Sequence, residues 1–154
     1  EREDIQRAVD SGATVCTHLG NGIVGRLPRH PNPLWTQLAC DDLCASFILD
    51  GHHVPQEFVR VALRAKGISR FLLVSDSVAS AGLEPGTYEV GGHEAVLGQD
   101  GKMSLVHKES LAGSAAVMRD CVRQIHDWEG LGRDGLMQVA RENPLSVLGL
   151  EDWF

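Results

Sequence analysis

"RFLLVSDS", residues 70–77, contains an aliphatic run without the polar alternation of a half-exposed strand. Such a run is typical of a strand that is covered on both faces, which is the environment of a parallel sheet. The run stops at Asp76, where an isolated buried carboxylate is costly unless it is solvated, paired or used in chemistry. Asp76 is therefore the first candidate functional residue, although an aspartate that caps the next segment fits the same position.

Two similar apolar runs precede this stretch and also end in polar residues: "ATVCTHLGNG" (13–22) and "CASFILDGHH" (44–53). Between the second and third runs, "PQEFVRVALRAKG" predicts a helix that begins near Pro55 and ends at Gly67. The residues expected on its buried face are Phe58, Val59, Ala62 and Leu63. Strand, loop, helix and strand form the βα unit, so an α/β fold is predicted. Only about three such units are present, whereas a closed (β/α)8 barrel takes about 250 residues, so the chain looks like part of a TIM-type barrel.

After the third run, a β-hairpin insertion and then helices are expected. Residues 82–110 contain short alternating segments separated by Gly-Gly and Asp-Gly turn signals, which indicate one or two hairpins. The segment 114–128 predicts a helix with Ser114 as its N-cap. A further helix is expected at about 134–142, and Pro144 would begin a short last turn or helix.

The composition is that of an ordinary globular protein with one domain, residues 1–154. Of these residues 43% are hydrophobic and 23% are charged, which suffices for a moderate core. The net charge of −7 argues against nucleic-acid or anionic-membrane partners, since both need clustered Lys and Arg. With no run of membrane-spanning length and no leader pattern, we expect a cytoplasmic location and a small-molecule or protein partner. The four cysteines form no CxxC pair and are expected to be reduced.

Polar residues follow all three apolar runs. His18, after the first run, could offer a neutral imidazole to a metal or substrate, but a histidine hydrogen-bonded at a loop base fits equally. Asp50 closes the second run ahead of His52 and His53. Adjacent side chains on an extended segment point in opposite directions, so at most one histidine should face a shared site, and a turn with exposed histidines is the alternative. We expect His18 and Asp76 to leave neighbouring parallel strands at a common edge of the sheet.

A small basic group lies in residues 20–35, which are rich in Gly, Pro and Asn and are expected to form a long loop. Its members are Arg26, Arg29 and His30. A guanidinium suits a phosphate or carboxylate, and Asn21 with Gly22 would add a side-chain amide and backbone N–H groups. A solvated loop with incidental charges is the alternative.

Six short motifs occur in an order and at spacings that resemble one enzyme family. They are "THLGNG" (17–22), "PRHP" (28–31), "DGHHVP" (50–55), "LVSDS" (73–77), "LAGS" (111–114) and "NPLSVLGL" (143–150). Together they resemble the C-terminal half of the barrel of N-acetylglucosamine-6-phosphate deacetylase, in the amidohydrolase superfamily, over residues 8–150. The resemblance implies that the three apolar runs are the sixth, seventh and eighth strands of a metal-dependent (β/α)8 barrel.

The activity that this resemblance implies is hydrolysis of the acetamide of N-acetylglucosamine 6-phosphate to glucosamine 6-phosphate and acetate. His18 would be one ligand of a divalent metal, with Zn²⁺ the expected ion, which lowers the pKa of its water and polarises the carbonyl. Asp76 would accept a proton from that water and pass it to the leaving amine. The family's other metal ligands, a glutamate and a histidine of earlier strands, have no counterpart in this sequence.

The resemblance also implies how the phosphosugar binds. Asn21 and Gly22 match the segment that contacts the phosphate, and Arg29 matches an arginine that reaches it across a homodimer interface. His53, rather than His52, matches the substrate-binding histidine, and Leu111 would lie beside the sugar. The glycine beside Asn21 stands where many relatives carry an aromatic residue, so another N-acyl or cyclic amide substrate stays open. A non-catalytic fragment is a third alternative, since open sheet edges need a partner.

Overall fold

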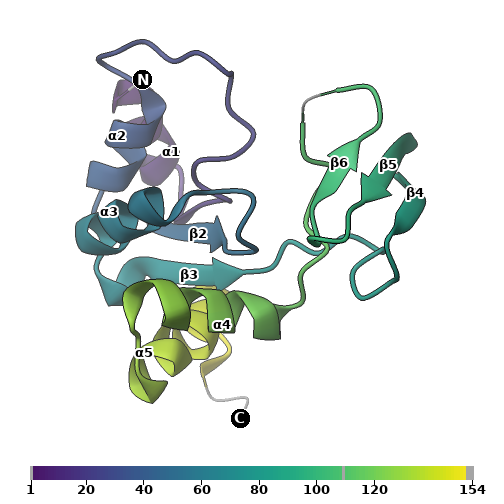
Figure 1. Cartoon of the computed structure of the whole chain (residues 1–154). Coiled ribbons are helices and arrows are strands. Elements are labelled where there is room, and N and C mark those ends of the chain that lie inside the picture. Colours follow the sequence, from purple (N-terminus) through teal and green to yellow (C-terminus); the bar gives the residue numbers. More distant parts are fainter. Residues whose placement is uncertain (1, 109, 152–154) are drawn as a thin grey trace.

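The computed structural model describes residues 2–108 and 110–151 and shows a mixed α/β fold with two separate sheets (Figure 1). The first sheet is parallel, in the order β1-β2-β3. Its strands are β1 (Val15–Cys16), β2 (Cys44–Ile48) and β3 (Phe71–Val74). The α/β class predicted from the sequence is confirmed, while the described residues form no closed barrel.

Helices flank the parallel sheet. Figure 1 shows α3 beside β2, with α2 and α1 beyond α3, and α4 beside β3, with α5 beyond α4. The helical elements are α1 (Arg2–Asp10), α2 (Pro33–Ala39), α3 (Gln56–Lys66), a 3₁₀ turn (Ile68–Arg70), α4 (Met118–Glu129), α5 (Arg133–Met137), a π-helical turn (Gln138–Glu142) and α6 (Asn143–Leu148). Among these described helices, none combines the length and the apolar character that crossing a membrane requires.

The core explains why the strands are uninterrupted apolar runs. Phe47 of β2 stacks on Phe71 of β3 with ring centroids 4.2 Å apart, and it meets the edge of Phe58 from α3 at 6.3 Å. Both strand phenylalanines are fully buried, as are Val59 and Ala62 on the predicted face of α3. A polar side chain inside these strands loses its solvation and needs a hydrogen-bond partner, so apart from Ser46 the polar groups lie at the strand ends.

The helix predicted to start at Ser114 begins later, and Ser114 is not its cap. Ser114 instead forms a parallel bridge with Ser77, and its carbonyl accepts a hydrogen bond from the Val78 N–H at 2.9 Å. Because pairing with the segment after β3 takes up this backbone, α4 starts only at Met118. Cys121 and Ile125 of α4 are fully buried, whereas Val117 and Met118, which stand at helical spacing with them in the sequence, are exposed.

The loop predicted for residues 20–35 ends earlier than expected, because α2 begins at Pro33. The Asn32 side-chain oxygen accepts hydrogen bonds from the N–H groups of Leu34 at 3.1 Å and Trp35 at 3.3 Å. Asparagine at the N-cap followed by proline at the first helical position is a recognised helix start. The sequence therefore contained the signal for α2.

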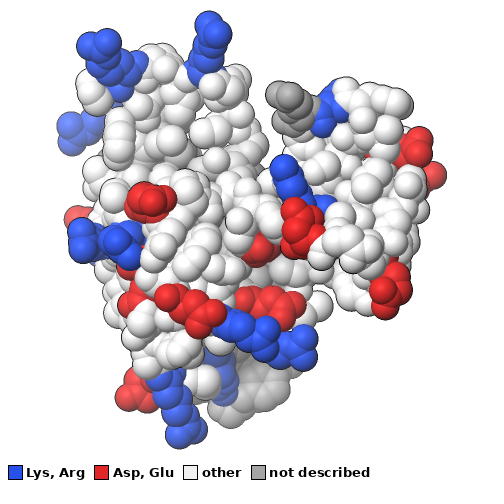
Figure 2. Space-filling model, in the orientation of Figure 1, with Lys and Arg blue, Asp and Glu red and all other residues white. Residues whose placement is uncertain are grey.

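The predicted hairpin insertion is an antiparallel sheet of β4 (Gly86–Val90), β5 (His93–Leu97) and β6 (Met103–Leu105). The predicted turn glycines all have positive φ: Gly91, Gly92 and Gly101. In Figure 1, β2 and β3 point toward this sheet, so it lies beyond the carboxyl edge of the parallel sheet. Figure 2 shows a groove between the two parts, open at the top of the view.

Asn143 anchors the C-terminal helices to the start of β3. Its side-chain nitrogen donates to the carbonyls of Ile68 at 2.7 Å and Phe71 at 2.8 Å, and its oxygen accepts from Gln138 at 2.6 Å. The residue is buried, with 4% of its surface exposed. Replacing it would leave two carbonyls without a donor in a site that water reaches poorly.

We therefore expect Asn143→Ala to lower the free energy of unfolding by roughly 2–4 kcal/mol, because unpaired buried polar groups are costly. The measurement is urea unfolding of both proteins. Glu142→Gln, at an exposed neighbouring position, is the control and should change stability by less than about 0.5 kcal/mol. Equal effects of the two substitutions would contradict the anchoring role.

Candidate active site at the carboxyl edge of the parallel sheet

His18 occupies a strained turn directly after β1. Its φ is 30°, a region that side-chain-bearing residues seldom occupy. Ser46 of β2 fixes the turn, since its hydroxyl accepts the His18 N–H and its carbonyl accepts the Leu19 N–H, each at 2.8 Å. A serine within the apolar run of β2 was the sequence signal for this support, and sequence reasoning missed it.

The segment after His18 closes back on the imidazole ring. The Asn21 N–H donates to the His18 carbonyl at 2.9 Å. A Cβ added to Gly22 would lie 3.2 Å from the His18 Cε1, and φ of Gly22 is 65°, so both space and backbone favour glycine here. The structure thus brings together three of the predicted site residues.

Two side-chain atoms in this turn lack partners. His18 Nδ1 and Asn21 Nδ2 are buried and have no hydrogen bond within the described chain. Buried polar atoms are nearly always paired, so neighbouring exceptions call for an explanation such as a ligand. Loop 17–22 is therefore suited to contact a metal or a polar ligand.

Asp50 and His53 form a buried pair after β2. The His53 Nδ1 lies 2.7 Å from Asp50 Oδ2, while Asp50 Oδ1 accepts the backbone N–H groups of His52 at 2.9 Å and His53 at 3.0 Å. Burial raises the pKa of the Asp50 carboxyl, but the hydrogen bonds from the His53 ring and the two N–H groups outweigh it and lower the pKa to about 2. Asp50 is therefore ionised at neutral pH.

Asp76 lies two residues beyond β3, and its position corrects two sequence expectations. The residue is exposed, so it does not bear the cost of a buried carboxylate. Its φ is 47°, and the Ser77 hydroxyl next to it donates to the Ala116 carbonyl at 2.6 Å. His18 and Asp76 leave the same edge of the sheet, but from strands that are not neighbours, because β2 lies between β1 and β3.

The remaining predicted residues lie outside this turn cluster. Arg26, Arg29 and His30 are all exposed on the loop before α2, as a solvated loop or an intermolecular contact would require. Leu111 is half-buried and bridges Ser104 in the antiparallel part of the fold. The residues that line a pocket of about 400 Å³ there are Lys102, Ser104, Lys108, Ser110 and Leu111.

The described residues do not by themselves fit a complete metal site. No three His, Cys, Asp or Glu residues within 2–108 and 110–151 are grouped so that they could bind an ion. A catalytic zinc takes about three protein ligands. The unpartnered Nδ1 shows that the His18 imidazole is free to serve as one of them.

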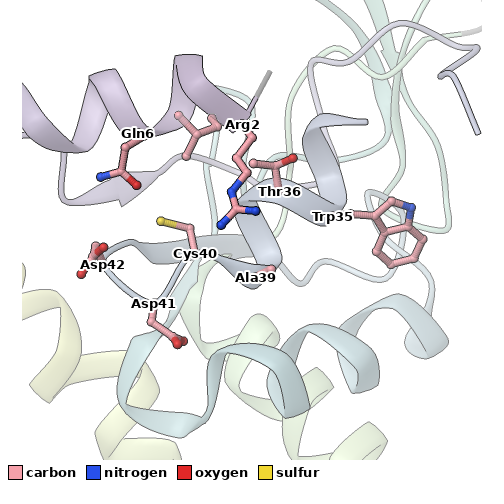
Figure 3. Close-up of a pocket in the computed structure, with 9 residues that line it drawn as sticks. Arg2, Gln6, Trp35, Thr36, Ala39, Cys40, Asp41 and Asp42 are labelled. Carbon is pink, nitrogen blue, oxygen red and sulfur yellow. The ribbon is translucent and has the colours of Figure 1, made fainter. Parts of the chain in front are cut away.

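A larger pocket, of about 530 Å³, lies away from these residues (Figure 3). It lies between α1, α2 and the turn before β2, which is the amino end of that strand. Its lining residues are Arg2, Ile5, Gln6, Trp35, Thr36, Ala39, Cys40, Asp41 and Asp42. None of the predicted site residues is among them, and Asp41 is paired with Arg70 at 2.8 Å.

No family model matches the chain, but individual known proteins do. N-acetylglucosamine-6-phosphate deacetylases of Bacillus subtilis and Bos taurus are 31% and 34% identical over 94% and 95% of this chain. An N-acetylgalactosamine-6-phosphate deacetylase from Shewanella is 30% identical over 95% of it. The chain spans only 36% of each of these relatives.

Solved structures give the same result. The N-acetylglucosamine-6-phosphate deacetylase of Thermotoga maritima matches with a TM-score of 0.89 at 28% identity, over 98% of this chain and 41% of that one. A mutant Mycobacterium smegmatis enzyme in complex with N-acetyl-D-glucosamine-6-phosphate matches with 0.87 at 29%, over 97% and 40%. The resemblance found in the sequence is confirmed, and it covers part of these proteins.

The Asp50 pair predicts a pH dependence of stability. The folded-state pKa of about 2 lies below the ordinary value of 3.8, so the stabilisation is fully present above about pH 4 and is lost as the pH falls toward 2. This difference corresponds to about 2 kcal/mol.

The test is urea unfolding between about pH 5.5 and pH 2.5, with Asp50→Asn and the exposed-site control Asp134→Asn. Asp50→Asn should be less stable than the parent at the higher pH and should lose less stability on acidification. Parallel pH profiles for the parent and Asp50→Asn would contradict the assignment.

Proposed function

We propose that this chain is part of an N-acetylglucosamine-6-phosphate deacetylase, which hydrolyses the acetamide to give glucosamine 6-phosphate and acetate. One observation carries the proposal: among the described residues, positive φ outside glycine occurs at His18 and Asp76. Strain of this kind tends to persist where function requires it. These are the two residues that the motifs assign to metal binding and catalysis, and they leave the same edge of one parallel sheet.

In this proposal β1, β2 and β3 are the sixth, seventh and eighth strands of a (β/α)8 barrel, with β4–β6 inserted after the last. The parallel order, the flanking helices and the TM-scores of 0.87 and 0.89 support this arrangement. In such barrels the loops at the carboxyl ends of the strands carry the active site. Both strained residues lie in these loops.

Asp76 is the proposed general acid and base. Its exposed carboxylate can accept a proton from the attacking water and then deliver it to the leaving amine. His18 would be one ligand of a divalent metal, by preference Zn²⁺, with its other ligands outside the described residues. Such an ion, when bound, activates water and polarises the acetamide carbonyl.

Binding of the phosphosugar would fall to residues around this edge. Asn21, with its unpartnered amide nitrogen, and Gly22 would face the phosphate. His53 would contact the substrate from the turn after β2, and Leu111 would pack beside the sugar. Arg29 is exposed, as expected of a side chain that reaches the phosphate of a second subunit. The proposed enzyme is therefore a homodimer, and its proposed location is the cytoplasm.

Asp76→Asn in the full-length protein, loaded with Zn²⁺, should reduce kcat by about 10²- to 10⁴-fold, because the proton transfer is lost. KM for N-acetylglucosamine 6-phosphate should change little. Steady-state kinetics measure both, with Asp127→Asn on the exposed side of α4 as the matched control. Unchanged turnover in Asp76→Asn would remove this residue from the mechanism.

Arg29→Ala should raise KM for the phosphorylated substrate about tenfold or more and leave an unphosphorylated acetamido sugar unaffected. Arg133→Ala, exposed on α5, serves as the control. Equal kinetics with both sugars before and after substitution would favour a different N-acyl or cyclic amide substrate.

A second candidate substrate is N-acetylgalactosamine 6-phosphate. It is favoured by the Shewanella relative, whose 30% identity is nearly the same as the 31% of the Bacillus subtilis protein. The two sugars differ only in the orientation of one hydroxyl, so the ratio of their kcat/KM values decides between them.

A further inference from the structure

We propose that Asp50 is a positioning residue that orients the His53 imidazole through a proton on Nδ1, so that Nε2 is presented to the ligand. The sugar contact rests on the proposed function, whereas the ring's protonation pattern does not. None of the motif assignments gives Asp50 a role.

Both oxygens of the Asp50 carboxylate are occupied by hydrogen bonds within this turn. Oδ1 accepts the N–H groups of His52 and His53, and Oδ2 faces the His53 Nδ1 at 2.7 Å. The side chains of Asp50 and His53 are only 4% and 7% exposed. An ionised carboxylate only accepts hydrogen bonds, so Nδ1 must carry a proton for this contact to exist. In the neutral ring this leaves Nε2 as the acceptor.

Two distant elements approach the turn that holds this pair, and one of them contacts it directly. Gly51 has a φ of 84°, and a Cβ added to it would lie 3.3 Å from the Gln124 amide oxygen of α4. The His52 Nε2 lies 3.2 Å from the carbonyl of Asp100, in the turn between β5 and β6. A carbonyl only accepts, so this contact requires the proton on Nε2 of His52.

In their neutral forms the two adjacent histidines would therefore be opposite tautomers. His52 is used to tie the turn to the antiparallel sheet, while His53 is oriented by Asp50. This division leaves Nε2 of His53, and not of His52, without a hydrogen-bond partner among the described residues, in agreement with the choice of His53 that the resemblance implied. It also gives the experiment an internal reference, because both rings are observed in one spectrum.

The function of the arrangement is orientation. A ring held at Nδ1 by a buried carboxylate cannot rotate or exchange tautomers without breaking a charge-assisted hydrogen bond. Its Nε2 can then accept a hydrogen bond from a sugar hydroxyl, and little side-chain entropy is lost on binding because the ring is already ordered. The same logic fixes metal-ligating histidines through a carboxylate at the second nitrogen.

The test is a long-range ¹H–¹⁵N NMR spectrum of the ¹⁵N-labelled chain above the pH at which histidines titrate. The expected pattern is Nδ1–H for His53 and Nε2–H for His52, with the signals assigned by His53→Gln and His52→Gln. Asp50→Ala should release His53 into a mixture of tautomers, whereas Asp50→Asn, whose amide oxygen still accepts, should retain Nδ1–H. Asp134→Ala, at an exposed position, should change neither ring.

An Nε2–H tautomer of His53 in the parent chain would overturn the proposal, and so would an unchanged His53 spectrum in Asp50→Ala. If Asp50→Ala fails to fold, retention of Nδ1–H in Asp50→Asn and its loss in Asp50→Leu decide the matter in the same way. In the full-length enzyme, Asp50→Ala should lower kcat/KM for N-acetylglucosamine 6-phosphate about tenfold to a hundredfold, with Asp50→Asn restoring much of it. An inactive parent enzyme would refute the proposed function and leave the NMR result to decide the tautomer.

Discussion

The parallel pairing of β2 with both of its neighbours is the interaction on which the rest of the structure depends. It sends the carboxyl ends of β1, β2 and β3 to one edge, and with them the turns that carry His18, Asp50 and Asp76. The pairing also supplies the side chain that shapes the first turn, since Ser46 of β2 accepts the His18 N–H. The pairing of β2 therefore sets both the position of these turns and the backbone conformation of the first one.

The same edge shows why polar residues occur where they do. The strands are covered on both sides, and Phe47 stacked on Phe71 leaves no room for a solvated group between them. Apart from Ser46, which is hydrogen-bonded inside β2, the polar side chains lie at the strand ends. There they are either paired, as in Asp50 with His53, or solvated, as in Asp76. His18 Nδ1 is neither paired nor solvated. Because buried polar atoms are nearly always hydrogen-bonded, this atom favours a ligand at this position.

The chain resembles only part of the known deacetylases, and its candidate site is also only part of a metal site. The chain matches 36% of the length of several curated relatives, and its described residues contain no group of three His, Cys, Asp or Glu that could bind an ion. What it does supply is one side of this edge, with the strained His18 and Asp76 and the buried Asp50–His53 pair. The antiparallel sheet, tied to the Asp50 turn through His52 and Asp100, would border that side.

The sequence alone determined the strands, the buried face of α3, the hairpin turns and the motif positions, because these follow from local periodicity and turn chemistry. The N-cap of α2 was also readable in Asn32 and Pro33, although it was not predicted. Only the tertiary structure decided that Ser114 pairs with Ser77 instead of capping α4. It alone gave His52 and His53 different partners and left Asp76 exposed. These features depend on contacts between segments far apart in the chain, and local sequence periodicity does not predict which segments will come into contact.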